Sequence, residues 1–171
     1  MLYKDPEFPI WDAIRWDDNG HHGGNGLSYQ EDEIEWIRVR DVYKPQDGFS
    51  LWGDNGISVQ DMRQGTIGNC WFISAASSLA EDPERLMNIF YNENKHDING
   101  ISINGIYAFN FYALFFPVTV TIDDRLPMKK DKPGKTMYAK IGRDNSVWAP
   151  LFEKAFAKYH GTYEPLWAGN A

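Results

Sequence analysis

Apolar residues recur at intervals of three and four positions in two stretches of this chain, which is the spacing of one helical face. The first stretch predicts a helix over Cys70–Ala80, and Asp82 and Pro83 end it because the residue before a proline disfavours the helical conformation. The second predicts a helix over Val147–His160, which Gly161 stops. The chain therefore contains at least two helices with an apolar side to bury.

Runs rich in aromatic and β-branched residues predict strands between these helices. Two such runs, Ile106–Ala113 and Pro117–Asp123, are joined by a short turn. Shorter patterns predict a strand over Ile34–Val39, a helix over Glu84–Tyr91 and a third strand over Met137–Ile141. We expect an α+β fold in which the helix headed by Cys70 is central and packs against further helices. A small antiparallel sheet from Ile106 to Ile141 lies alongside.

The N-terminal part of the chain is rich in turn-forming residues. We expect residues 1–63 to form a leader that packs on a core made by residues 64–171. His21 and His22 are adjacent on a glycine-rich loop with no cysteine nearby, which makes a poor zinc site. His96 falls in a polar stretch, where an exposed loop position is the simpler interpretation.

Charge and composition exclude several classes of protein. The 171 residues carry a formal net charge of -7, which argues against a nucleic-acid partner because such partners need a basic surface. The single cysteine excludes an internal disulfide and fits a reducing, cytoplasmic compartment. No signal peptide is visible. The longest apolar stretch, Phe109–Val120, is too short for a transmembrane segment.

The only cysteine stands where a glycine-bearing loop enters the predicted helix. Gly65 and Gly68 precede it, and Asn69 is a plausible N-cap, which puts Cys70 in the first helical turn. Unpaired backbone N–H groups and the positive end of the helix dipole favour a thiolate there. Gln64 could supply a second hydrogen-bond donor to an oxyanion beside the sulfur. The competing interpretation is an inert cysteine packed in the core.

The stretch Gln64-Gly65-Thr66-Ile67-Gly68-Asn69-Cys70-Trp71-Phe72-Ile73-Ser74-Ala75 resembles the active-site signature of the calpain family of papain-like cysteine proteases. The family usually has Asp where this chain has Asn69, a change that keeps the capping oxygen and removes a charge. The resemblance implies that Cys70 is the nucleophile and that Gln64 helps to hold the oxyanion. It also implies that Gly68 and Trp71 line the substrate side and that the substrates are proteins.

The resemblance covers only the cysteine-bearing half of such a protease core. In calpains the catalytic His and Asn lie on a second subdomain that follows a segment matching Tyr163–Gly169, and this sequence ends at Ala171. We therefore expect a thiol endopeptidase subdomain for intracellular limited proteolysis, which is inactive without the second subdomain. The alternative is a non-catalytic calpain-like binding or regulatory module. Asp123 and Asp124 match a structural Asp-Asp-x-Leu-Pro turn of the family rather than an acid–base pair.

The loop Asp54–Asp61, just before the cysteine stretch, is rich in oxygen donors suited to a hard cation. Its spacing is not that of an EF-hand, so an ordinary turn remains the alternative. Calpain cores bind Ca²⁺ at the matching place, through two carbonyls and two carboxylates. The resemblance implies carbonyl ligands from Asp54 and Gly56, and carboxylate ligands from Asp61 and from Glu153 in the helix Glu-Lys-Ala-Phe-Ala-Lys.

Overall fold

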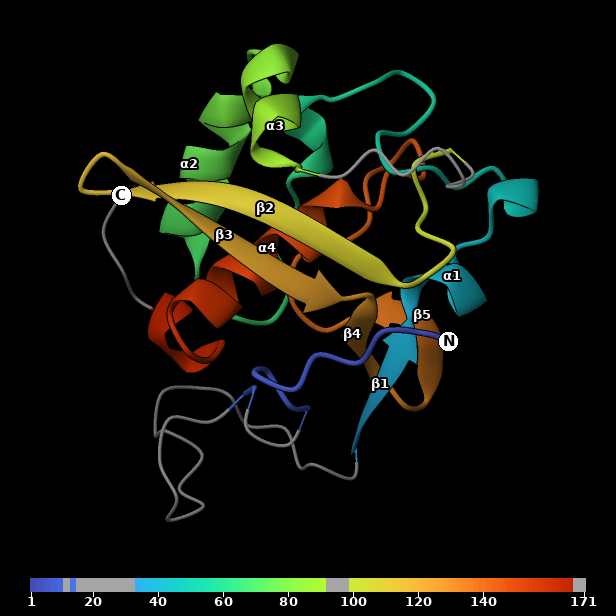
Figure 1. Cartoon of the computed structure of the whole chain (residues 1–171). Coiled ribbons are helices and arrows are strands. Elements are labelled where there is room, and N and C mark those ends of the chain that lie inside the picture. Colours follow the sequence, from blue (N-terminus) through green and yellow to red (C-terminus); the bar gives the residue numbers. More distant parts are fainter. Residues whose placement is uncertain (11–12, 15–32, 92–98, 168–171) are drawn as a thin grey trace.

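A computed structural model describes residues 1–10, 13–14, 33–91 and 99–167 (Figure 1). Helices and strands follow one another in separate runs rather than in alternation, which is an α+β arrangement, as the sequence predicts. The helices are α1 (Val39–Val42), α2 (Cys70–Ala80), α3 (Pro83–Ile89) and α4 (Trp148–Tyr159), with single 3₁₀ turns η2 (Pro45–Asp47), η3 (Val59–Asp61) and η4 (Glu164–Leu166). The strands are β1 (Ile34–Arg38), β2 (Ile106–Ala113), β3 (Phe116–Asp123), β4 (Arg125–Lys129) and β5 (Lys132–Thr136).

The predicted pair of strands forms a long antiparallel hairpin. Strands β2 and β3 pair from Ile106 opposite Asp123 to Ala113 opposite Phe116. A two-residue turn, Leu114–Phe115, joins them. The hairpin runs across α4 (Figure 1). The strand prediction for this region is confirmed to within one residue at the start of β3.

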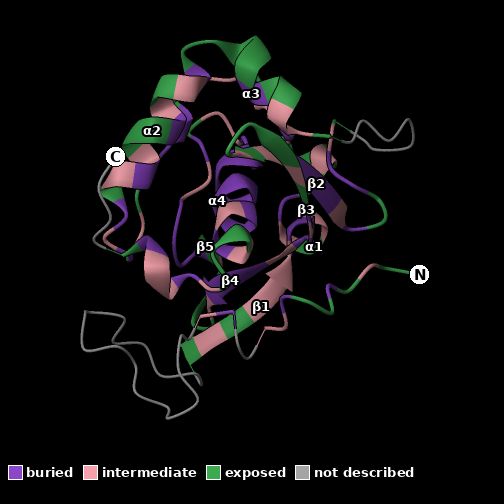
Figure 2. Ribbon diagram, turned by 60° about the vertical axis from the view of Figure 1, so that its left-hand side comes forward, coloured by how far each residue is buried: buried purple, intermediate pink, exposed green. Residues whose placement is uncertain are grey.

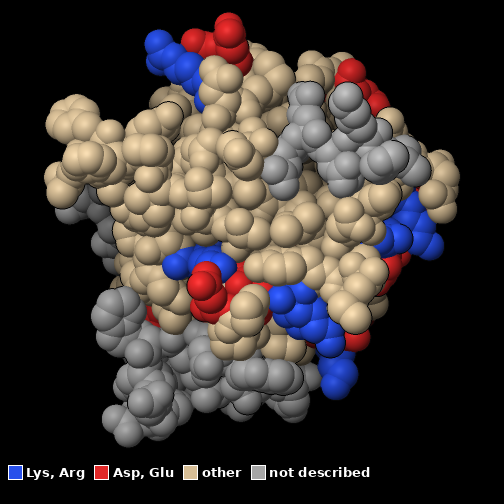
Figure 3. All heavy atoms as spheres, viewed as in Figure 1, with Lys and Arg blue, Asp and Glu red and all other residues tan. Residues whose placement is uncertain are grey.

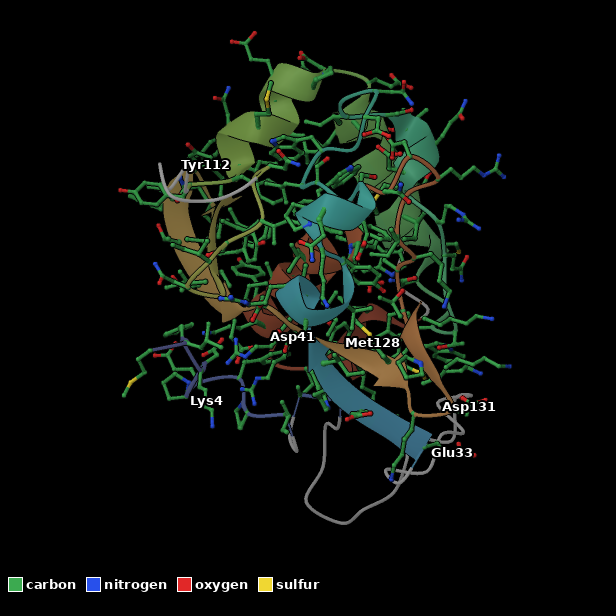
Figure 4. The ribbon with its side chains drawn as sticks, turned by 90° about the vertical axis from the view of Figure 1, so that its right-hand side faces the viewer. Lys4, Glu33, Asp41, Tyr112, Met128 and Asp131 are labelled. Carbon is green, nitrogen blue, oxygen red and sulfur yellow. The ribbon has the colours of Figure 1, made fainter. Side chains whose placement is uncertain are left out.

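The expectation of one sheet that includes Met137–Ile141 is wrong. A separate three-stranded sheet has the order β1-β4-β5. The basic stretch after Lys129 is the connection and second strand of the β4–β5 hairpin. Met128 of β4 lies in the interior (Figure 4) and is fully buried. Because β1 comes from a distant part of the chain, local pattern could not reveal that it is the partner of β4.

The most deeply buried helix is α4, not α2. Nine of the twelve residues of α4 are buried, against three of the eleven residues of α2. Figure 2 shows α4 enclosed by the other elements, while α2 and α3 lie at the surface. Among the small residues Ala75, Ala76, Ser77 and Ser78 of α2, only Ala76 is buried, while Ala75 and Ser78 are exposed. The prediction of a central, buried α2 is therefore wrong for the described residues.

Aromatic rings bind α2, α4 and the hairpin into one core. Phe72 of α2 stacks on Phe156 of α4, with 4.8 Å between ring centroids. Phe111 of β2 packs against Phe152 of α4 at 5.8 Å. Such large apolar side chains contribute most of the stabilisation from burial, at about 25 cal/mol for each Å² removed from water. This core fixes the position of the N-terminus of α2.

Buried ion pairs tie the turn after β3 to α4. The Lys154 ammonium donates to the Asp123 carboxylate at 2.6 Å and to two main-chain carbonyls. Burial disfavours the Asp123 carboxylate, but Lys154 and Arg125 together hold its pKa well below its usual range. Asp124 pairs with Arg38 of β1. These contacts support the interpretation of the Asp-Asp turn as structural.

The first residues of the chain also pack on α4. The backbone N–H of Asp5 donates to Asp123 at 3.0 Å, and Lys158 donates to both carboxylate oxygens of Asp5.

Of the helices in the described ranges, none has the length and apolar character needed to cross a bilayer.

Candidate active site

Cys70 is the first residue of α2 and its side chain is exposed. The first helical hydrogen bond runs from the Ile73 N–H to the Asn69 carbonyl at 3.1 Å. The N–H groups of residues 70–72 therefore precede the i→i−4 ladder and lack a partner within the helix. A negative charge on the sulfur or beside it is favoured at this end of the helix.

The loop that leads to Cys70 is held against a second segment, residues 137–140. The Thr66 N–H donates to the Met137 carbonyl at 2.9 Å, and the Lys140 N–H donates to the Arg63 carbonyl at 2.8 Å. A Cβ on Gly65 would lie 1.7 Å from the main-chain oxygen of Tyr138. Only glycine allows this approach, so Gly65 sets how closely the loop before Cys70 packs on residues 137–140.

Asn69 occupies the N-cap position, but its side chain does not cap the helix. Instead its amide donates to one oxygen of Glu153 at 2.6 Å, and the other oxygen of Glu153 accepts the Ala139 N–H at 2.7 Å. The capping role predicted for the Asn69 side chain is wrong. Burial raises the pKa of Glu153 to about 7, although both hydrogen bonds oppose that shift. Glu153 thus joins the cysteine loop to the segment behind it.

Gln64 has an exposed side chain whose amide donates to the Ile67 carbonyl at 2.8 Å. This bond uses one of the two amide hydrogens and orients the group. The second hydrogen remains for another acceptor.

The two residues predicted on the substrate side lie against the η4 segment. The indole N–H of Trp71 donates to the Leu166 carbonyl at 2.8 Å, and its ring packs on Phe156. A Cβ on Gly68 would lie 2.9 Å from the indole nitrogen of Trp167. Trp167 is 36% exposed, so this indole lies at the surface against the loop two positions before Cys70. Sequence reasoning missed Trp167; the glycine two positions before the cysteine was the available signal.

The acidic loop places Asp61 in a buried position. Its carboxylate accepts the Ser58 N–H at 2.9 Å and the indole N–H of Trp148 at 3.2 Å. Burial, together with the neighbouring carboxylate of Asp144, raises the pKa of Asp61. One buried oxygen of Asp144 has no hydrogen-bond partner among the described residues. Sequence reasoning did not select Asp144, because it lies 83 positions from Asp61 in the chain.

The structure pairs Asp61 with Asp144 rather than with Glu153. Trp148, which contacts Asp61, precedes Glu153 by five residues on α4, so the two side chains leave the helix about 140° apart. Both oxygens of Glu153 already accept hydrogen bonds elsewhere. Two adjacent carboxylates with an unpartnered oxygen fit a hard cation. Within the described ranges, no group of three His, Cys, Asp or Glu side chains is arranged to hold a metal.

Asp54 and Gly56, the predicted carbonyl ligands, lie on the loop before η3. The Asp54 N–H donates to the Asp144 carbonyl at 3.3 Å, which brings this loop to Asp144. Gly56 adopts φ 75°, a left-handed conformation that favours glycine. The three histidines considered in the sequence, His21, His22 and His96, lie outside the described residues.

Comparison with known proteins identifies the family. The profile of the family described as "Calpain family cysteine protease" matches residues 3–171. The chain is 33% identical over 171 residues to Calpain-12 of Homo sapiens and 34% identical over 177 residues to Calpain-5 of Mus musculus. It is 34% identical over 172 residues to Calpain-A of Drosophila melanogaster.

Each alignment takes in 99% of this chain but only 22%, 24% and 18% of the respective relative. The chain thus spans at most about a quarter of the curated relatives it matches. Within that span the match runs through the cysteine loop, both sheets and α4. On this evidence, the chain belongs to the calpain family of cysteine proteases.

Proposed function

We propose that this chain is the cysteine-bearing subdomain of a papain-like, calcium-dependent endopeptidase that cuts protein substrates in the cytoplasm. The observation that carries the proposal is the exposed thiol of Cys70 at the uncapped N-terminus of α2, above a loop locked to residues 137–140. A second subdomain supplies the His and Asn that the reaction needs. The exposed side of α2 is the surface available to that subdomain.

The chemistry begins when the imidazole of the second subdomain takes the proton of Cys70. The thiolate attacks the carbonyl carbon of the scissile peptide, a C–S bond forms, and the carbonyl electron pair moves to oxygen. That oxyanion accepts hydrogen bonds from the Cys70 N–H and from the amide hydrogen of Gln64 that Ile67 leaves unused. When the C–N bond breaks, the amine takes the proton from the imidazolium, and water then hydrolyses the thioester.

Gly68 and Trp71 take structural parts in this scheme, and Trp167 joins them. The absence of a side chain on Gly68 lets the Trp167 indole approach the loop closely. Trp71 anchors η4 through the Leu166 carbonyl, which keeps that indole beside the thiol. Together they form one wall of the substrate site.

Calcium belongs to the proposal as a ligand of the loop that precedes Gln64. The carboxylates of Asp61 and Asp144, with carbonyls of Asp54 and Gly56, would hold it. Asp144 replaces Glu153 in the set because Asp144 is the carboxylate adjacent to Asp61. Bound Ca²⁺ would offset the repulsion between the two carboxylates. Because Gln64 follows Asp61 by three positions, ordering this loop would also orient the oxyanion donor.

Alkylation of the thiol tests the nucleophile without the second subdomain. The matched control is Cys70→Ala combined with Ser78→Cys, which moves the thiol to an exposed position near the other end of α2. The unpaired N–H groups at the start of α2 favour negative charge on the sulfur. Cys70 should therefore react faster near pH 7 than the thiol at the control position. Equal rates would contradict an activated nucleophile and favour a non-catalytic module.

Protease activity is tested with the full chain and casein as substrate. We expect no cleavage by the chain alone, and cleavage when the second subdomain of a calpain relative is added. Cys70→Ala should abolish that cleavage. Cleavage by the unaided chain that Cys70→Ala removes would show that no second subdomain is needed.

Calcium binding is tested by isothermal titration, which does not depend on activity. Asp144→Asn should abolish Ca²⁺ binding, whereas Glu153→Gln should leave it unchanged. The opposite pattern would restore Glu153 to the ligand set, and no binding by the wild-type chain would remove calcium from the proposal.

A further inference from the structure

The turn of the β2–β3 hairpin exposes large apolar side chains. Tyr112, Leu114, Phe115 and Phe116 are 74%, 88%, 99% and 74% exposed. Figure 1 shows the hairpin extending beyond the helices, and Tyr112 points outward in Figure 4. We call residues 112–117 the hairpin tip. Single exposed apolar residues are ordinary, but a contiguous apolar patch marks an interaction site.

Folding alone does not account for these residues. Leu114 and Phe115 have φ of 49° and 70°, the left-handed region in which two-residue hairpin turns favour Asn-Gly. Bulky side chains in that region cost conformational energy. The tip therefore combines backbone strain with exposure of apolar surface, and Asn-Gly would relieve both.

The tip is apolar on both faces of the ribbon. Cross-strand partners point to the same side of a hairpin, so Tyr112 and Pro117 share one face while Ala113 and Phe116 share the other. A ribbon that docks on a protein surface needs only one apolar face. Apolar side chains on both faces and at the turn instead suit immersion in a medium that is apolar on all sides.

Charge distribution points to the same medium. The chain has 24 acidic and 17 basic residues, yet residues 99–122 contain no Asp, Glu, Lys or Arg. Figure 3 shows a protrusion at the hairpin end of the molecule without a charged side chain. No charge has to be desolvated for the tip to enter hydrocarbon. Tyr112, with an apolar ring and a polar hydroxyl, is a residue type enriched at the membrane–water boundary.

We propose that the hairpin tip inserts into the surface of a neutral phospholipid bilayer and so makes this domain a peripheral membrane-binding module. Leu114, Phe115 and Phe116 enter the acyl-chain boundary, and Tyr112 lies at the headgroup level. Because residues 99–122 contain no basic residue, the proposal is committed to uncharged lipid, since an anionic surface would repel a chain of net charge -7.

Flotation with phosphatidylcholine vesicles in EDTA tests the proposal with the full chain. The informative variant combines Leu114→Asn with Phe115→Gly, which removes the apolar side chains and installs the turn residues that favour this hairpin. A loss of binding by this variant cannot be attributed to unfolding. Met87→Asn is the matched control, because Met87 is 44% exposed on α3, outside the hairpin.

We expect the wild-type chain and Met87→Asn to float with the vesicles, and the tip variant to bind at least about ten-fold more weakly, since one buried Leu or Phe is worth about that factor. Replacing part of the lipid by phosphatidylserine should not increase binding. Cys70→Ala should float like the wild type, so this result is independent of the protease proposal.

Three results would overturn the inference. They are no flotation of the wild-type chain, equal flotation of the tip variant, and concentration-dependent self-association that the tip variant abolishes while no lipid is bound. The last would identify the tip as a contact with a second copy.

Discussion

Replacing Glu153 by Gln removes a buried carboxylate from behind the cysteine loop. The side chain is fully buried and accepts hydrogen bonds from Asn69 and Ala139. A Gln can satisfy the same neighbours, since its oxygen accepts the Ala139 N–H while its amide donates to the Asn69 oxygen, which has no partner among the described residues. This requires only that the Asn69 amide turn over. The substitution therefore changes charge with little change of shape.

The magnitude follows from the pKa of Glu153, which burial raises from 4.5 to about 7. Between these values the folded state binds the proton more tightly than the unfolded state, so the free energy of unfolding falls as pH rises. The loss from pH 5 to pH 8 is about 2.5 kcal/mol, because one pKa unit corresponds to about 1.36 kcal/mol and most of the rise in pKa falls in this window. Glu153→Gln abolishes this contribution.

The assay is urea unfolding in EDTA, followed by fluorescence of the seven Trp residues at intervals from pH 5 to pH 8. The quantity of interest is the stability of Glu153→Gln minus that of the wild type, because contributions of other groups cancel. This difference should grow with pH by about 2.5 kcal/mol across the range. A difference that is constant with pH would refute the reasoning, and one that shrinks would mean that Glu153 is stabilised as the anion.

Further predictions concern the groups that position the cysteine loop and α4. Gly65→Ala should lower the free energy of unfolding by roughly 3 kcal/mol or more, because the new methyl group would overlap a main-chain carbonyl of the facing segment; an unchanged urea midpoint would contradict this. Lys154→Met should cost about 3–5 kcal/mol at pH 7 and less at low pH, where the Asp123 that has lost its ammonium partner becomes protonated; a loss equal at pH 3 and pH 7 in thermal unfolding would count against the ion pair. Asn69→Asp would place a second carboxylate at the 2.6 Å contact with Glu153, and it should destabilise the chain by about 2 kcal/mol more at pH 8 than at pH 5. Adding Glu153→Gln should remove this extra loss of stability at pH 8.

The sequence by itself determined the local elements and the position of Cys70 in the fold. Helical spacing placed a helix over Cys70–Ala80 with the observed bounds, and β-branched and aromatic runs gave the hairpin. The loop glycines put the cysteine at the start of that helix. These features depend on neighbours within a few positions, where backbone preferences and side-chain periodicity act directly.

Tertiary structure decided which distant residues meet. Strand β1 pairs with β4 in the three-stranded sheet. Residues 137–140, outside that sheet, form main-chain hydrogen bonds with the loop that precedes Cys70. Asn69 turns from its own helix to Glu153, 84 positions away, because an isolated buried carboxylate needs donors more than an exposed helix end needs a cap.

The loop Asp54–Asp61 and the core helix show the same division between local sequence and tertiary structure. Asp61 lies beside Asp144 because the segment before α4 folds back over η3, and no spacing along the chain records that return. Helix α4, not α2, is the buried centre, since both sheets and α2 bury their apolar sides against it. Local periodicity shows that a helix has an apolar face, whereas the depth of its burial depends on how many elements cover it.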